Sequence, residues 1–104
     1  MSEANPTVLD PLIHEAARLV IVSVLNECGA ASFTFVLGAT GLTRGNLSAH
    51  MARLIAAGYV EEDKQIVERK LRTEYRLTPI GRKAFAKYRV EWTRLTTAPY
   101  GRST

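Results

Sequence analysis

The segment from Gly41 to Thr78 constrains the fold of this chain most, because a short helix pattern runs directly into a hairpin pattern. Thr43 stands where a helix N-cap is expected, and apolar residues recur at helical spacing from position 47 to position 55. Gly58 follows where a helix end needs a residue that tolerates positive φ. The pattern predicts a helix over about 44–57 with one apolar stripe.

The opposite face of this predicted helix is polar and has few bulky side chains. Such a face suits the major groove of DNA, where Arg pairs with guanine, Asn with adenine, and hydroxyl groups with either. An ordinary amphipathic surface helix has the same spacing, so the helix alone leaves both interpretations open. We predict that Arg44, Asn46, Ser48 and Ala49 face base edges, and that Thr43, Gly45, His50 and Arg53 lie nearer the phosphates.

A β-hairpin rich in positive charge is predicted directly after the helix. Its first strand covers 59–67 and its second 73–78, where Tyr75 and Leu77 are expected to face the core. The predicted loop, 68–72, suits contact with a phosphate backbone or a minor groove, although most charged turns are only solvated. The residues of the hairpin predicted to contact DNA are Lys64, Arg69, Lys70 and Arg72.

The motifs GLTRGNLSAHMARLIAAGYVE and RTEYRLTPIGRKAF resemble, in this order, the MarR-type winged-helix transcriptional regulators. The resemblance is strongest to their short single-domain branch, which is akin to the ArsR-type repressors, and it spans about residues 12–92. It implies that the first motif holds the recognition helix, that the basic hairpin is the wing, and that the second motif leads into a dimerisation helix. The expected function is therefore sequence-specific binding of double-stranded DNA in transcriptional regulation.

Charge is divided unevenly along the chain, whose formal net charge is +4. Residues 1–42 contain one Arg against four acidic residues, a net charge of −3, whereas residues 43–104 contain thirteen Lys and Arg against six acidic residues, a net charge of +7. The positive half is the one that holds the predicted recognition helix and wing, as an electrostatic contact with DNA requires.

Three further helices are expected around this segment. Asp10 and Pro11 are typical of an N-cap and a first helical residue, and the helix they begin ends near position 29. Ser32 is expected to cap the positioning helix of a helix-turn-helix over 33–40. Thr78 and Pro79 begin the last helix, whose apolar stripe runs over 80–95 and includes Ile80 and Ala84. The domain then covers 10–96, between a flexible arm over 1–9 and a flexible tail over 97–104.

Together these elements predict one α+β domain, mainly α, with a winged helix-turn-helix, a two-stranded wing and a C-terminal dimerisation helix. The family resemblance implies a homodimer whose recognition helices meet major grooves about 34 Å apart on a near-palindromic operator. The wide apolar arc of the first helix also favours a second packing surface, although a central helix in a small fold has such an arc too. The expected interface residues are Leu12, Leu19, Ile21, Val22, Phe85, Tyr88, Trp92 and Leu95.

Several other classes of protein fit the sequence poorly. With one cysteine, no apolar run of membrane-spanning length and no signal peptide, we expect a cytoplasmic protein without a membrane partner. His14 and His50 have no metal-pair spacing, and no catalytic serine or phosphate-loop motif occurs, so we expect no enzyme, metal or cofactor. Two alternatives stay open: a winged-helix protein–protein adaptor whose basic wing binds an acidic partner, and control by an unidentified small-molecule effector.

Overall fold

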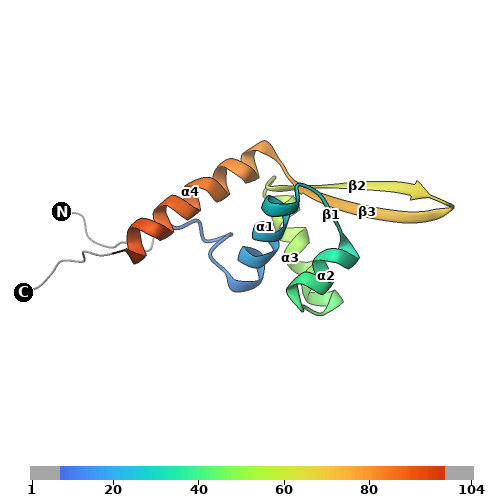
Figure 1. Cartoon of the computed structure of the whole chain (residues 1–104), viewed down its shortest axis with the longest axis horizontal. Helices are drawn as coiled ribbons and strands as arrows, with labels where there is room; N and C mark the ends of the chain where they lie inside the picture. Colours follow the sequence, from blue (N-terminus) through green and yellow to red (C-terminus); the bar gives the residue numbers. More distant parts are fainter. Residues whose placement is uncertain (1–7, 98–104) are drawn as a thin grey trace, which may run out of the picture.

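Four helices and a three-stranded antiparallel sheet make up residues 8–97, the part of the chain that this computed structural model describes. The elements in chain order are α1 (Ala16–Cys28), β1 (Ala31–Ser32), α2 (Phe33–Thr40), α3 (Arg44–Ala56), β2 (Val60–Val67), β3 (Lys70–Leu77) and α4 (Pro79–Thr96). The β2–β3 hairpin and α4 leave the body formed by α1, α2 and α3 on opposite sides (Figure 1). The mainly helical winged-helix fold predicted from sequence is confirmed.

Three of these helices begin at the residues that the sequence indicates. The caps of α2, α3 and α4 are Ser32, Thr43 and Thr78, and each hydroxyl oxygen accepts a hydrogen bond from the backbone N–H three residues later. Each bond satisfies a donor that the first turn of a helix leaves unpaired. The predicted recognition helix, α3, therefore begins where local sequence alone places it.

The predicted start of the first helix is wrong. Asp10 does not begin a helix: one carboxylate oxygen accepts the N–H of Leu12 in a turn, and the other accepts the hydroxyl of Tyr59 at 2.5 Å. This hydrogen bond, with burial, raises the pKa of Tyr59 to about 12. The helix begins only after Glu15, whose carboxylate caps it. A contact distant in sequence thus holds Asp10, so residues 10–15 form a turn.

The sheet contains a strand that the sequence analysis missed. The wing has two strands as predicted, but β1 also pairs with β3, at Ala31↔Tyr75 and Ser32↔Glu74, so the strand order is β1-β3-β2. A strand of two residues is too short to show the alternation by which strands are recognised in a sequence.

The turn of the hairpin is tighter than predicted. Val67 pairs with Lys70, so only Glu68 and Arg69 form the turn, in place of the expected loop over 68–72. Their φ angles are 52° and 67°, positive as in the mirror-image two-residue turns that suit the twist of a hairpin. Lys70 and Arg72 consequently belong to β3 and point to one face of the strand.

The hydrophobic core lies between the sheet and the helices. Tyr75 and Leu77 face it as predicted, with 7% and 1% of their surface exposed. Leu9, in the expected arm, is also buried there. The largest fully buried side chains are Ile13, Ile21, Val22, Leu25, Val36, Leu47, Met51, Leu54 and Leu77. No helix of residues 8–97 is long and apolar enough to cross a membrane.

The apolar stripe of α4 is only partly as predicted. Phe85, Tyr88 and Leu95 are buried, but Ile80 is 64% exposed, so its assignment to the stripe is wrong. Gly81 occupies the core-facing position instead, because the backbone of Tyr59 lies directly against it. A Cβ atom at Gly81 would meet the Tyr59 carbonyl oxygen at 2.1 Å.

We expect Gly81→Ala to lower the free energy of unfolding by about 2 kcal/mol, because a backbone carbonyl cannot move aside as a flexible side chain does. Gly38→Ala is the matched control, since a Cβ at this helical glycine has no neighbour within 4 Å and alanine favours the helix by roughly 0.5–1 kcal/mol. Urea unfolding followed by circular dichroism measures both. Equal stability of the two variants would contradict the close packing of α4 on Tyr59.

Candidate nucleic-acid interface

Helix α3, the predicted recognition helix, presents the predicted contact residues on its solvent side. Thr43, Arg44, Gly45, Asn46, Ser48, Ala49 and Arg53 are exposed, and His50 is half-buried. The opposite side of α3 is buried in the core. The packing of α3 therefore leaves a polar face outward, with its hydrogen-bonding groups in the first two turns.

Arg44 is held in a particular direction by an aromatic side chain. Its guanidinium lies over the ring of Phe33, 5.6 Å from the ring centre, a contact worth about 0.5–1 kcal/mol at an exposed site. Both residues line a groove of about 780 Å³, to which the start of α2 and strand β3 also contribute, the latter through Arg72 and Thr73. Arg44 of α3 thus lines a groove that wing residues also line. The sequence did not reveal this groove, because three separate segments form it.

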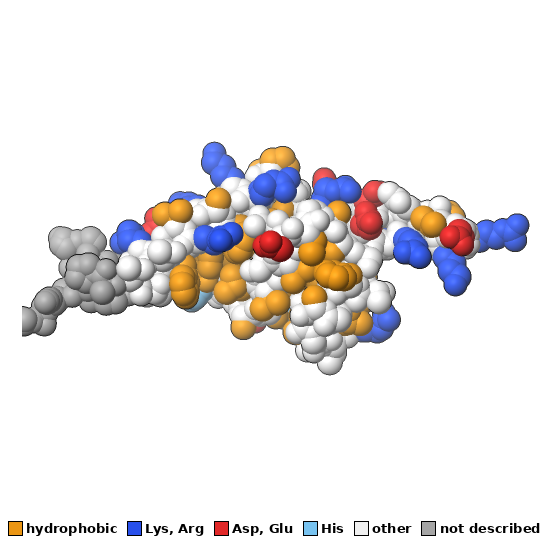
Figure 2. Space-filling model, viewed as in Figure 1, with side chains coloured by type: hydrophobic (Ala, Val, Ile, Leu, Met, Phe, Trp, Pro, Cys, Tyr) orange, Lys and Arg blue, Asp and Glu red, His pale blue; other side chains and the backbone are white. Residues whose placement is uncertain are grey.

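The wing carries cations that are free to meet an anion. Arg69, Lys70 and Arg72 are exposed, and no acidic group of residues 8–97 lies within ion-pair distance of them. Lys64 is 3.9 Å from Glu62, a loose contact at an exposed position that contributes little. Lys and Arg side chains project from the far end of the wing (Figure 2).

An apolar pair lies next to these cations. Ile66 and Leu71 are direct cross-strand partners, and 78% and 66% of their surfaces are exposed. Such cross-strand apolar pairs stabilise a hairpin by about 0.2–1 kcal/mol. The pair supports the wing where no helix covers it. The sequence analysis missed this pair because it placed Leu71 in the loop.

Helix α1 contacts the inner edge of the His50 ring. Nη1 of Arg18 is 3.2 Å from Nδ1 of His50, and Nε of the same guanidinium donates a hydrogen bond to the carbonyl of Leu12 at 2.6 Å. Arg18 is only 8% exposed. Sequence reasoning gave it no role; the one available signal was that Arg18 is the single Lys or Arg of residues 1–42.

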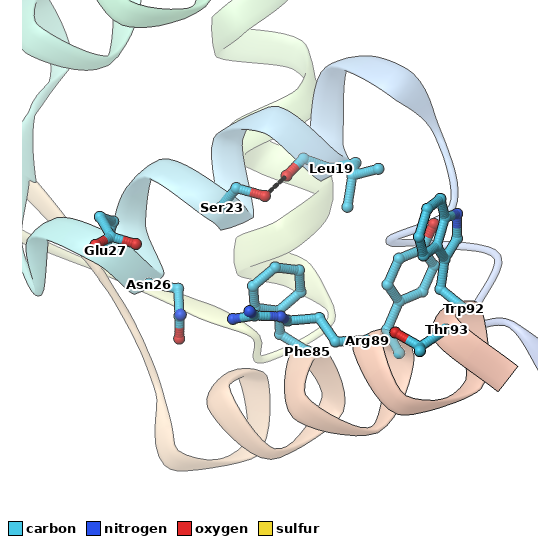
Figure 3. Close-up of a pocket in the computed structure, with 9 residues that line it drawn as sticks. Leu19, Ser23, Asn26, Glu27, Phe85, Arg89, Trp92 and Thr93 are labelled. Carbon is cyan, nitrogen blue, oxygen red and sulfur yellow. Dashed lines mark hydrogen bonds between the residues drawn. The ribbon is translucent and has the colours of Figure 1, made fainter. Parts of the chain in front are cut away.

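The residues expected at a dimer interface are not all available to a partner. Ile21 and Val22 are buried within the core of this chain, at 0% and 1% exposure, whereas Trp92 is 47% exposed. Leu19 of α1 lines a groove of about 410 Å³ that Phe85 and Trp92 of α4 also line (Figure 3). Leu12 is half-buried, and Tyr88 and Leu95 are buried. Of the expected interface residues, Trp92 and the half-buried Leu19 are therefore the ones that remain open to a partner at the groove between α1 and α4.

No group of three or more His, Cys, Asp or Glu side chains within residues 8–97 is arranged to hold a metal ion. His14 instead pairs with α4, since its Nδ1 lies 2.8 Å from the hydroxyl of Tyr88.

Proteins of known sequence are similar to this chain over most of its length. A family model described as a winged helix DNA-binding domain matches residues 17–96. Uncharacterized protein MJ0432 of Methanocaldococcus jannaschii is 29% identical over 77 residues, which are 74% of this chain and 84% of that protein.

Solved structures show the same architecture. A transcriptional regulator homologue from Pyrococcus horikoshii OT3 superposes with a TM-score of 0.76 at 26% identity, over 81% of this chain and 83% of that one. A mutant of MarR from E. coli, solved with operator DNA, gives a TM-score of 0.67 at 18% identity, over 83% of this chain and 64% of that one, a likeness of fold. The chain belongs to the winged helix DNA-binding domain family, and its structural neighbours are MarR-family transcriptional regulators.

Proposed function

We propose that this chain is a sequence-specific regulator of transcription that binds double-stranded DNA as a homodimer in the cytoplasm. The observation that carries the proposal is the groove shared by Arg44 of α3 and Arg72 of the wing, because it places a cation of the helix and a cation of the hairpin along one surface. When a DNA duplex lies along this surface, one of its strands contacts both α3 and the hairpin. The name of the Pyrococcus horikoshii protein and the operator DNA bound to E. coli MarR support the same function.

The side chains divide into two roles. Asn46, Ser48 and Ala49, exposed on the outer face of α3, are assigned to base edges in the major groove. Arg44 was expected to read bases, but its stacking on Phe33 beside Arg72 favours a phosphate contact between helix and wing. The cations of the hairpin are assigned to phosphates of the same DNA strand.

Replacing Arg69 or Lys70 with Ala is expected to weaken binding to all duplexes about equally. Each change removes a phosphate contact, so the slope of log affinity against log salt should fall by about 0.9. Fluorescence anisotropy over a salt series, on selected and random duplexes, measures this. Lys83→Ala, an exposed cation on α4, is the matched control and should leave the slope unchanged. If all three variants behave alike, overall charge rather than the wing controls the salt dependence.

Asn46→Ala is expected to relax the base preference at one position of each half-site, at a cost of about 1–3 kcal/mol for a lost bidentate contact with adenine. Selection of binding sites from random duplex DNA, with wild type and variant in parallel, measures the preference. Lys70→Ala serves as the control, because it should weaken binding without changing the selected sequence. Identical selected sequences for wild type and Asn46→Ala would remove Asn46 from base recognition. No enriched sequence for the wild type would favour the adaptor alternative.

The proposed homodimer uses the groove between α1 and α4. A domain of this size buries a limited share of its surface, so covering Trp92 and the Leu19 side of the groove stabilises it further. Two copies related by a two-fold axis then present two α3 helices to one duplex.

Trp92→Ala is expected to raise the dimer dissociation constant about 30-fold, the effect of losing a central aromatic contact worth about 2 kcal/mol. Sedimentation equilibrium measures the constant. Because Trp92 is the chain's only tryptophan, its emission in the wild type should also shift with protein concentration. Val90→Ala, which removes an exposed apolar side chain from another face of α4, is the control. An interface elsewhere is indicated if Val90→Ala weakens association and Trp92→Ala does not.

A further inference from the structure

Arg18 is the one charged side chain buried within residues 8–97, at 8% exposure. A buried cation is costly unless hydrogen bonds replace its water, and the guanidinium has two such contacts. Nε donates to the carbonyl oxygen of Leu12, in the turn before α1, and Nη1 lies 3.2 Å from Nδ1 of His50, on the recognition helix. The proposed function leaves this connection between α1 and α3 unexplained.

The contact with Arg18 determines which nitrogen of His50 carries a hydrogen. A guanidinium has only donors, so Nδ1 must accept, and the hydrogen of the neutral ring then lies on Nε2. The nearest carboxylate, that of Glu15, does not move this hydrogen to Nδ1. Glu15 Oε1 is 3.9 Å from Nδ1, too far for a hydrogen bond, and it already accepts the backbone N–H of Arg18 at 2.9 Å. That hydrogen bond lowers the pKa of the Glu15 carboxyl, which stays ionised as the cap of α1.

The Nε2–H group of His50 is open to solvent. It has no hydrogen-bond partner within residues 8–97, and no side-chain nitrogen or oxygen of that part is both buried and unpaired. His50 follows Asn46 by four residues and precedes Arg53 by three, so the ring lies beside two exposed, DNA-facing positions of α3. The ring is thus fixed on its inner edge and presents one donor on its outer edge.

We propose that Arg18 is a positioning residue for DNA binding: it holds the His50 ring so that Nε2–H donates a hydrogen bond to a backbone phosphate beside α3. The inference rests on the proposed function and adds a buried residue to it. Since the ring is neutral in this arrangement, the contact adds a hydrogen bond without releasing a counterion. It therefore differs from the wing cations in its response to salt.

Two substitutions of His50 separate the outer nitrogen from the inner one. The amide nitrogen of glutamine reaches the place of Nε2, whereas the asparagine amide reaches only the place of Nδ1. Binding to the selected duplex should be about five- to tenfold weaker for His50→Asn and within about twofold of wild type for His50→Gln. Both variants should keep the wild-type salt slope, unlike Arg69→Ala. Full affinity of His50→Asn combined with weak binding of His50→Gln would overturn the proposal.

Arg18→Met tests the positioning role itself. It should weaken DNA binding severalfold in the wild-type background and have little further effect in the His50→Gln background, if Arg18 acts through the ring. Equal losses in both backgrounds would show that Arg18 supports the fold alone. Circular dichroism establishes which variants are folded, and the His50 pair decides the question if Arg18→Met is not.

The ¹⁵N chemical shifts of the His50 ring give a readout that needs no DNA. In the free wild-type protein we expect the hydrogen on Nε2, and a proton found on Nδ1 would refute the inference directly. Wild-type protein that binds no duplex would refute the proposed function. If the wild type and both His50 variants bind DNA equally well, the phosphate contact of His50 and the positioning role of Arg18 are both refuted, while the proposed function stands.

Discussion

The arrangement of this domain depends on a backbone contact between the end of α3 and the start of α4. The Tyr59 carbonyl accepts the N–H of Thr78 at 3.0 Å, and Gly81 packs on the same carbonyl. The hydroxyl of Thr78 also donates to the carbonyl of Gly58. Because β2 leaves residue 59 and α4 follows β3 directly, this junction sets the directions of the wing and α4 relative to the recognition helix. The two extensions consequently leave the body on opposite sides (Figure 1).

That geometry separates two kinds of surface. The wing carries Arg69, Lys70 and Arg72, which no acidic group of residues 8–97 pairs, and it shares a groove with the first residue of α3, a combination that suits a polyanion. The α4 side carries Trp92 over an apolar groove, a combination that suits a second protein surface. If charges of both signs were mixed evenly over the whole molecule, neither a polyanion nor a second protein surface would be favoured as a partner. The proposed dimeric DNA-binding regulator uses each surface for the chemistry it offers.

The turn over residues 10–15 connects these surfaces through polar contacts. Asp10 accepts the Tyr59 hydroxyl at the base of the wing, and His14 pairs with the Tyr88 hydroxyl on α4. The carbonyl of Leu12 accepts from Arg18, which in turn contacts the recognition helix. Except for the contact between Leu12 and Arg18, these contacts join residues far apart in the chain, so no local pattern indicates them. They also explain why the first helix starts late, because these partners hold the turn in place.

The sequence by itself determined the features that depend on neighbouring residues. The caps of α2, α3 and α4, and the inward positions of the second wing strand, follow from hydrogen bonds within one turn and from strand alternation. The polar face of the recognition helix and the basic hairpin were predicted for the same reason. Only the tertiary structure decided the start of α1, the pairing of β1, the replacement of Ile80 by Gly81 in the core and the burial of Arg18. Those outcomes depend on contacts between segments distant in sequence, whose free energies exceed the local preferences that a sequence pattern reports.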